Sequence, residues 1–71
     1  MRREVLVKFG RKVRSQRIKL NLSQEELAAR ADVHRTYIGM IERAEKNITL
    51  ENIEKIIRAL GLKIREFFED F

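Results

Sequence analysis

Two short helical segments separated by a tight turn constrain the fold of this chain more than any other feature. Ser23 is a favourable N-cap residue and Glu26 follows three positions later, so the capping-box pattern predicts a helix that starts directly after Ser23. That helix is expected to stop near Asp32, because aspartate adopts a left-handed turn conformation more easily than most residues. The next helix is expected to begin at His34 or Arg35, which leaves only a tight turn between the two.

The second of these segments, residues 34–43 with the sequence HRTYIGMIER, has two unlike faces. At the helical period, Ile38 and Ile41 fall on one side, which suits a core. The opposite side carries Thr36, Gly39, Met40 and Arg43, flanked by Arg35 and Tyr37. These side chains are poorly suited to burial in a core, but they can bind a hydrated, negatively charged surface. The pattern indicates a helix-turn-helix arrangement whose second helix reads DNA.

The absence of cysteine excludes disulfides and zinc ribbons as a means of stabilising a chain of 71 residues. A single compact helical domain spanning residues 1–71 is therefore expected. No apolar run is long enough to span a bilayer, and residues 1–12 lack the long apolar core of a secretory signal. We accordingly expect a soluble cytoplasmic protein with no membrane partner.

Positive charge is concentrated in the part of the chain that contains the predicted DNA-reading helix. Residues 1–43 hold eleven Lys and Arg against five Asp and Glu, a net charge of +6. Residues 44–71 hold five against six, a net charge of −1. This distribution favours a polyanionic partner. The alternative is a solvated basic surface that has no partner.

An arginine interrupts the apolar stripe of the first predicted helix, residues 3–20. The stripe consists of Leu6, Phe9, Val13 and Leu20. Arg17 lies on the same stripe, and an unpaired buried charge is very costly. Glu42 lies beside Ile38 on the inward side of the later helix, so we predict an ion pair between Arg17 and Glu42. In the alternative, Arg17 reaches the surface along its apolar stem and Glu42 turns outward.

Two further helices are predicted after residue 48, which makes an all-α chain of five helices. Thr49 can cap a core helix that ends at Gly61. Its apolar face carries Ile53, Ile56, Ile57 and Leu60. The last segment, residues 62–71, is predicted to form a helix with a second apolar face. That face consists of Ile64, Phe67, Phe68 and Phe71.

The aromatic C-terminal face predicts a homodimer. Two of its rings can close the core of one chain, and the remainder would form an exposed apolar patch that a twofold partner covers. In the alternative, all the rings pack inside the monomer. Residues 50–71 are thus assigned to both the core and dimerisation. A dimer would also let two reading helices address half-sites about one DNA turn apart.

The segment LSQEELAARADVHRTYIGMIERAEKN, residues 22–47, resembles the Cro/phage-repressor type of helix-turn-helix family. Within that family, HRTYIGMIER followed by NITLENIEKIIRALG is most similar to the controller proteins of restriction–modification systems. The resemblance covers nearly the whole chain and implies a compact lambda-repressor-like DNA-binding domain, with the motif at about residues 23–43. The family commonly has an Arg–Glu pair at positions 17 and 42. It usually has glycine where this chain has Asp32, so we expect the turn to survive at a modest cost in stability.

The resemblance also implies roles for individual side chains. Those expected to contact bases in the major groove are Arg35, Thr36, Tyr37 and Met40. Those expected to contact the DNA backbone are Gln24, His34, Arg43, Lys46 and Asn47. Arg35 can donate two parallel hydrogen bonds to guanine. Tyr37 could instead cover the edge of the core. Gly39 either permits a close approach or is tolerated at an exposed site.

These expectations describe a transcriptional regulator that binds a near-palindromic operator as a homodimer and controls its own gene. The controller resemblance adds a neighbouring restriction endonuclease gene as a target, and activation would add RNA polymerase as a partner. The alternatives are a simple phage-type repressor and an antitoxin-type protein whose aromatic C-terminal face binds another protein. His34 is the only histidine and has no cysteine near it, so no metal site, cofactor or catalytic activity is expected.

Overall fold

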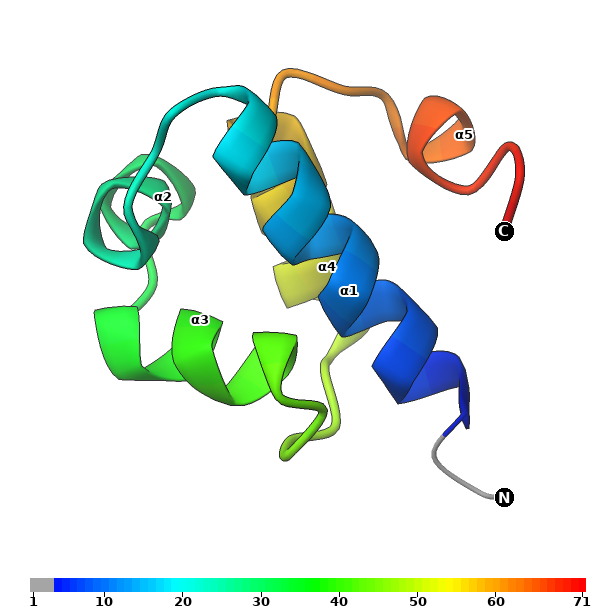
Figure 1. Ribbon diagram of the computed structural model, residues 1–71, viewed down its shortest axis with the longest axis horizontal. Coiled ribbons are helices and arrows are strands. Elements are labelled where there is room, and N and C mark those ends of the chain that lie inside the picture. Colours follow the sequence, from blue (N-terminus) through cyan, green and yellow to red (C-terminus); the bar gives the residue numbers. More distant parts are fainter. Residues whose placement is uncertain (1–3) are drawn as a thin grey trace.

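The computed structural model describes residues 4–71, and every regular element in that range is a helix (Figure 1). The elements are α1 (Glu4–Lys19), α2 (Gln24–Ala31), α3 (Arg35–Glu42), α4 (Leu50–Ala59) and α5 (Ile64–Phe67). The predicted start of the first helix at residue 3 lies outside the described residues. The all-α, five-helix fold expected from the sequence is confirmed.

Local sequence signals fix both ends of α2. Glu26 donates its backbone N–H to Ser23 Oγ over 3.0 Å, and the N–H of Ser23 donates to Glu26 Oε1 over 2.7 Å. This reciprocal capping box satisfies two backbone donors that the helix itself leaves unpaired. The helix ends at Asp32, whose φ of 60° and ψ of 47° are left-handed. The predicted start and stop are therefore confirmed, and the turn survives without glycine.

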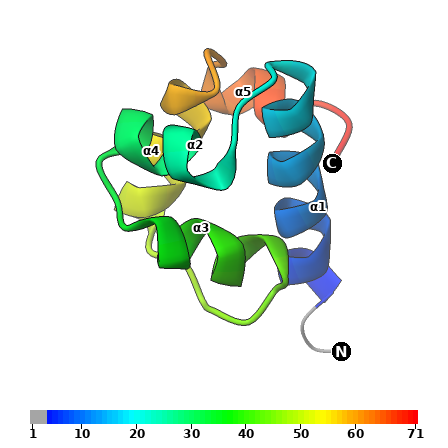
Figure 2. The same ribbon diagram turned by 60° about the vertical axis from the view of Figure 1, so that its left-hand side comes forward.

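The core lies between α1, the helix-turn-helix pair and α4. Its largest fully buried side chains are Val13, Leu27, Ile38, Ile41, Ile56, Ile57 and Phe67. Figure 2 shows α1 running past one end of α3, and α2 packs against both α3 and α4. In both views α5 lies away from α3 (Figures 1 and 2). The surface of α3 and the C-terminal region can therefore serve different partners.

α1 approaches α3 closely at Gly10, which is buried in the middle of α1. A Cβ at this position would overlap the main-chain oxygen of Ile41 and would lie 3.1 Å from that of Glu42. Only glycine lets α1 and α3 pack at this separation. Gly10 could not be identified from the sequence, because its position on the helix reveals nothing about the backbone opposite.

Leu20 corrects one detail of the predicted apolar stripe. Its side chain is 44% exposed, because α1 ends at Lys19 and the chain then turns through Asn21, whose φ is 58°. The buried part of the stripe in α1 consists of Phe9 and Val13. Leu22 closes the core at the entrance to α2 instead.

The C-terminal helix is shorter than predicted, because α5 makes only one turn and Phe71 follows it outside the helix. Phe67 is fully buried, with its ring centroid 5.2 Å from that of Phe9. Its expected role in a dimer interface is therefore wrong: it is a core residue of the monomer. Phe68 is half-buried against the core, whereas Ile64 is 44% and Phe71 is 36% exposed. An apolar patch consisting of these three residues remains.

Candidate nucleic-acid interface

The two faces of α3 are separated as predicted. Ile38 and Ile41 are buried in the core, whereas Arg35 and Thr36 are exposed and Met40 is half-buried. We call Arg35, Thr36 and Met40 the recognition face. The helix begins with His34, whose Nδ1 accepts the backbone N–H of Thr36 over 3.1 Å. Because Nδ1 is the acceptor, neutral His34 carries its proton on Nε2, a donor suited to a phosphate oxygen.

An ion pair holds α3 against α1. Arg17 Nε lies 2.7 Å from Glu42 Oε2, and Arg17 Nη2 donates to Glu42 Oε1 over 3.1 Å. Nη1 of Arg17 donates to the carbonyl oxygen of Leu22 over 2.8 Å. The side chains are only 12% and 3% exposed, respectively, so the predicted pair is present and largely removed from water. Hydrogen bonding to Glu42 raises the pKa of Arg17, which keeps the guanidinium charged.

Glu42 also anchors the start of α2. Gln24 Nε2 donates to Glu42 Oε1 over 3.0 Å. A primary amide has two N–H donors, so the second can still meet a phosphate. Gln24 was expected to contact the DNA backbone, and its anchor to α3 fixes where that contact would occur.

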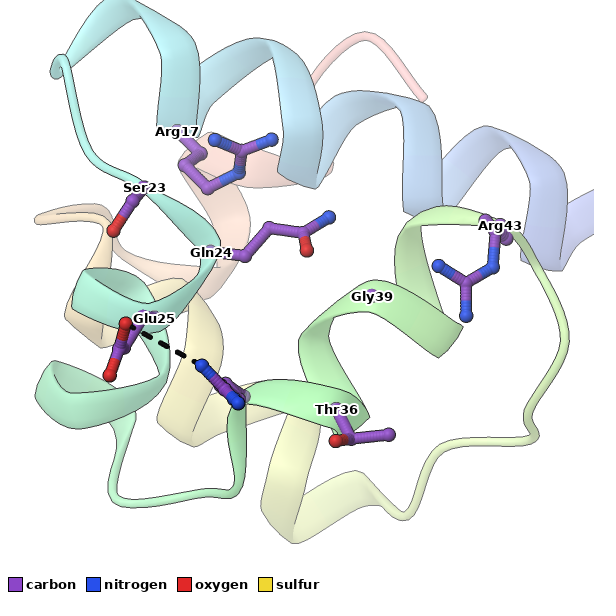
Figure 3. Close-up of a pocket in the computed structure, with 8 residues that line it drawn as sticks. Arg17, Ser23, Gln24, Glu25, Thr36, Gly39 and Arg43 are labelled. Atoms are coloured by element: carbon purple, nitrogen blue, oxygen red, sulfur yellow. Dashed lines mark ion pairs between the residues drawn. The ribbon is translucent and has the colours of Figure 1, made fainter.

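An open groove of about 570 Å³ lies between the start of α2 and the outer side of α3 (Figure 3). We call it the α2–α3 groove. Its lining consists of Arg17, Ser23, Gln24, Glu25, Arg35, Thr36, Gly39 and Arg43. The sequence analysis missed Glu25, which lies 3.8 Å from Arg35 Nη1 (dashed line in Figure 3). Both of these side chains are well exposed, so solvent weakens their attraction and leaves Arg35 able to exchange partners.

Gly39 is buried, although it belongs to the outer side of α3. A Cβ at this position would lie 3.1 Å from Arg43 Nη1 and 3.5 Å from Gln24 Oε1. Two polar side chains therefore cover it. The interpretation that glycine is merely tolerated at an exposed site is wrong, and the close-approach interpretation is supported.

Tyr37 links α3 to α4. Its ring packs against the core, and its hydroxyl oxygen accepts a hydrogen bond from Asn52 Nδ2 over 3.0 Å. These contacts support the interpretation in which Tyr37 covers the core edge. The sequence analysis did not anticipate Asn52, because the pair is fifteen residues apart and depends on how α3 and α4 pack. A base contact by Tyr37 stays a prediction.

The segment after α3 carries further polar side chains, of which Arg43 lines the groove. Arg43 Nε lies 3.0 Å from Glu45 Oε2, and hydrogen bonding to Glu45 together with its negative charge raises the pKa of Arg43. Lys46 and Asn47 are exposed. Ala44, between these groups, has a left-handed φ of 59°, so the chain turns sharply where α3 ends.

Within residues 4–71, no cluster of three or more His, Cys, Asp or Glu side chains could hold a metal ion. None of the helices described there combines the length and the apolar character needed to cross a membrane.

Comparison with known proteins places this arrangement in context. The Helix-turn-helix family HTH_3 matches residues 13–67. Control protein C.BamHI of Bacillus amyloliquefaciens is 47% identical over 70 residues, spanning 97% of this chain and 86% of that protein. The crystal structure of the restriction-modification controller protein C.AhdI from Aeromonas hydrophila matches with a TM-score of 0.87 and 43% identity, covering 92% of this chain and 98% of that one. The C.Esp1396I tetramer in complex with its natural 35 base-pair operator matches with a TM-score of 0.87 and 34% identity, covering 92% and 86%.

Proposed function

This chain belongs to the HTH_3 helix-turn-helix family, and we propose that it is a DNA-binding transcriptional regulator of the controller class found in restriction–modification systems. The observation that carries the proposal is the recognition face of α3, which lies beside a groove that Arg17, Gln24 and Glu42 hold in shape. A controller with the same fold has been crystallised on its operator.

In this proposal α3 enters the major groove and one DNA strand passes along the α2–α3 groove. Arg35, Thr36 and Met40 contact base edges, and Tyr37 is the fourth proposed base contact. Arginine can bind guanine through two parallel hydrogen bonds, threonine can bond a base edge, and methionine can contact thymine methyl groups. The proposed backbone contacts are Gln24, His34, Arg43, Lys46 and Asn47. They position the helix without reading the sequence.

We further propose a homodimer joined through Ile64, Phe68 and Phe71, the apolar patch that one chain leaves uncovered. Two copies related by a twofold axis would bind a near-palindromic operator. The genes controlled would be its own and that of the associated restriction endonuclease. RNA polymerase is the partner expected where binding activates transcription. The chain as a whole would then form a single DNA-binding and dimerising domain.

Fluorescence anisotropy on the DNA upstream of the gene tests the proposal against a shuffled duplex. The salt concentration should be about 150 mM, so that phosphate attraction does not dominate. Binding at least about a hundredfold tighter to the upstream fragment is expected. Equal weak binding to both duplexes would refute sequence-specific regulation by this chain alone, and would direct attention to a protein partner for the aromatic patch.

Two substitutions separate base contacts from backbone contacts. Arg35→Ala should lower affinity for the operator by roughly 1–3 kcal/mol while leaving binding to the shuffled duplex largely unchanged. Lys46→Ala should weaken binding to both duplexes alike and reduce the salt slope by about one unit. Equal losses on both duplexes for Arg35→Ala would remove that residue from base recognition.

A further inference from the structure

We infer that Gly39 is a positioning residue: its missing side chain leaves a seat on α3 that holds the Arg43 guanidinium where it can bind one DNA phosphate. This inference rests on the proposed function. It assigns a role in DNA binding to a residue that has no side chain to touch the DNA.

The absent side chain of Gly39 leaves space on α3 that two polar side chains border. Figure 3 shows Gly39 on α3 between the side chains of Gln24 and Arg43, which come from different elements. The position of its absent Cβ is 3.1 Å from Arg43 Nη1 and 3.5 Å from Gln24 Oε1. The first of these distances is shorter than most Cβ contacts, so a methyl group would push the guanidinium away by a few tenths of an ångström. The space that glycine leaves is therefore used by the cation.

The second argument is that both polar side chains are anchored at one end. Gln24 Nε2 is bound to Glu42 over 3.0 Å, and Arg43 Nε lies 3.0 Å from Glu45 Oε2. Because Arg43 Nε is held by Glu45, the terminal nitrogens of Arg43 stay free to donate, and Nη1 lies nearest to Gly39. Guanidinium nitrogens bind phosphate oxygens well, whereas Gln24 turns its amide oxygen toward Gly39, so Arg43 is the donor at this place.

The third argument is that the fold itself does not require this glycine. Glycine lowers the stability of a helix interior relative to alanine. At Gly39 the added Cβ would meet the far end of an exposed, flexible arginine, which can move. At Gly10 it would meet backbone oxygens, which cannot. Gly10 thus serves the packing of α1 on α3, whereas Gly39 has a cost that packing does not explain.

The test is Gly39→Ala, measured for both stability and DNA binding. The substitution should raise Tm by a few degrees, because alanine is the better helix former. It should also weaken binding to the upstream duplex by about three- to tenfold at 150 mM salt and reduce the salt slope by about one unit, as expected for the loss of one phosphate contact. A variant that is more stable but binds less tightly cannot owe its weaker binding to unfolding.

Two controls assign the effect to the seat. Ser15→Ala is an exposed change on α1 outside the α2–α3 groove, and it should raise stability without changing affinity. In an Arg43→Ala background, Gly39→Ala should cause little further loss of affinity, because the guanidinium it would displace is gone.

Unchanged affinity for Gly39→Ala would overturn the inference. The inference would also be overturned if Gly39→Ala lowered DNA affinity by the same factor in the wild-type protein and in the Arg43→Ala protein. A wild-type protein that bound the upstream and shuffled duplexes equally would refute the proposed function, yet the effect of Gly39→Ala on that phosphate-driven binding would still decide the inference.

Discussion

Replacing Gly10 with alanine tests how closely α1 approaches α3. The added Cβ would overlap the main-chain oxygen of Ile41 and lie 3.1 Å from that of Glu42. Neither oxygen belongs to a flexible side chain, so the two helices must separate to admit the methyl group. Gly10→Ala should therefore destabilise the domain, although alanine is intrinsically the better helix former.

Three contributions set the magnitude. Helix propensity favours alanine by about 1 kcal/mol. Overpacking a closed contact costs roughly 1–3 kcal/mol. Separating the helices also stretches the Arg17–Glu42 pair, and complete loss of a buried pair costs roughly 3–5 kcal/mol. With the pair partly retained, we expect a net loss of about 2–3 kcal/mol. That is a large share of the roughly 4–10 kcal/mol typical of a domain of this size.

Urea unfolding followed by far-UV circular dichroism measures this loss, with Ser15→Ala as a control for alanine on α1. All variants should be compared at one protein concentration, because the proposed dimerisation would make stability depend on concentration. We expect Gly10→Ala to melt at a Tm lower by about 10 °C or more. A Gly10→Ala protein as stable as the wild type would refute the close approach of α1 and α3.

Three further substitutions test the ion pair, the turn and the helix cap that hold α2 and α3 in place. Glu42→Gln leaves the Arg17 guanidinium without its counter-charge and should cost about 3 kcal/mol in urea unfolding; a loss below about 0.5 kcal/mol would mean that solvent screens the pair. Asp32→Gly relieves a left-handed φ of 60° and should raise Tm slightly; a lower Tm would show that the aspartate stabilises the turn. Hydrogen bonds from the backbone and side chain of Ser23 lower the pKa of Glu26 below its ordinary value of 4.5. Because the folded-state pKa is the lower one, this contribution to stability is present above pH 4.5 and is lost as the pH falls through the folded pKa. Glu26→Gln should reduce the loss of unfolding free energy as the pH falls below 4.5. An NMR titration in which the Glu26 carboxyl shows no lowered pKa would contradict the capping role.

Features that depend on neighbours in sequence could be predicted. The capping box of Ser23 and Glu26 needs only residues three apart, and it defines the start of α2. The pairing of Arg17 with Glu42 could be predicted over a longer separation, because each charge is out of place on its own apolar stripe. Such mismatches carry information about tertiary contacts, since burying either charge alone would be prohibitive.

Features that depend on what lies opposite a residue could not be predicted. Gly10 is required by carbonyl oxygens of α3, and Gly39 is covered by Arg43 and Gln24, so helical spacing alone could not decide between the two interpretations of Gly39. Phe67 shows the same limit. The helical period puts it on one face with Phe71, yet α5 ends after a single turn and one ring enters the core while the other stays partly exposed.

Glu42 receives hydrogen bonds from both Arg17 and Gln24, so one carboxylate joins α1, α2 and α3. None of the side chains on the recognition face takes part in that junction. Arg35, Thr36 and Met40 can therefore be exchanged in combination without disturbing the junction that orients them. In the proposed function the recognition face reads the operator, while the junction at Glu42 keeps the three helices in place. A few substitutions on that face would then retarget the domain to another operator.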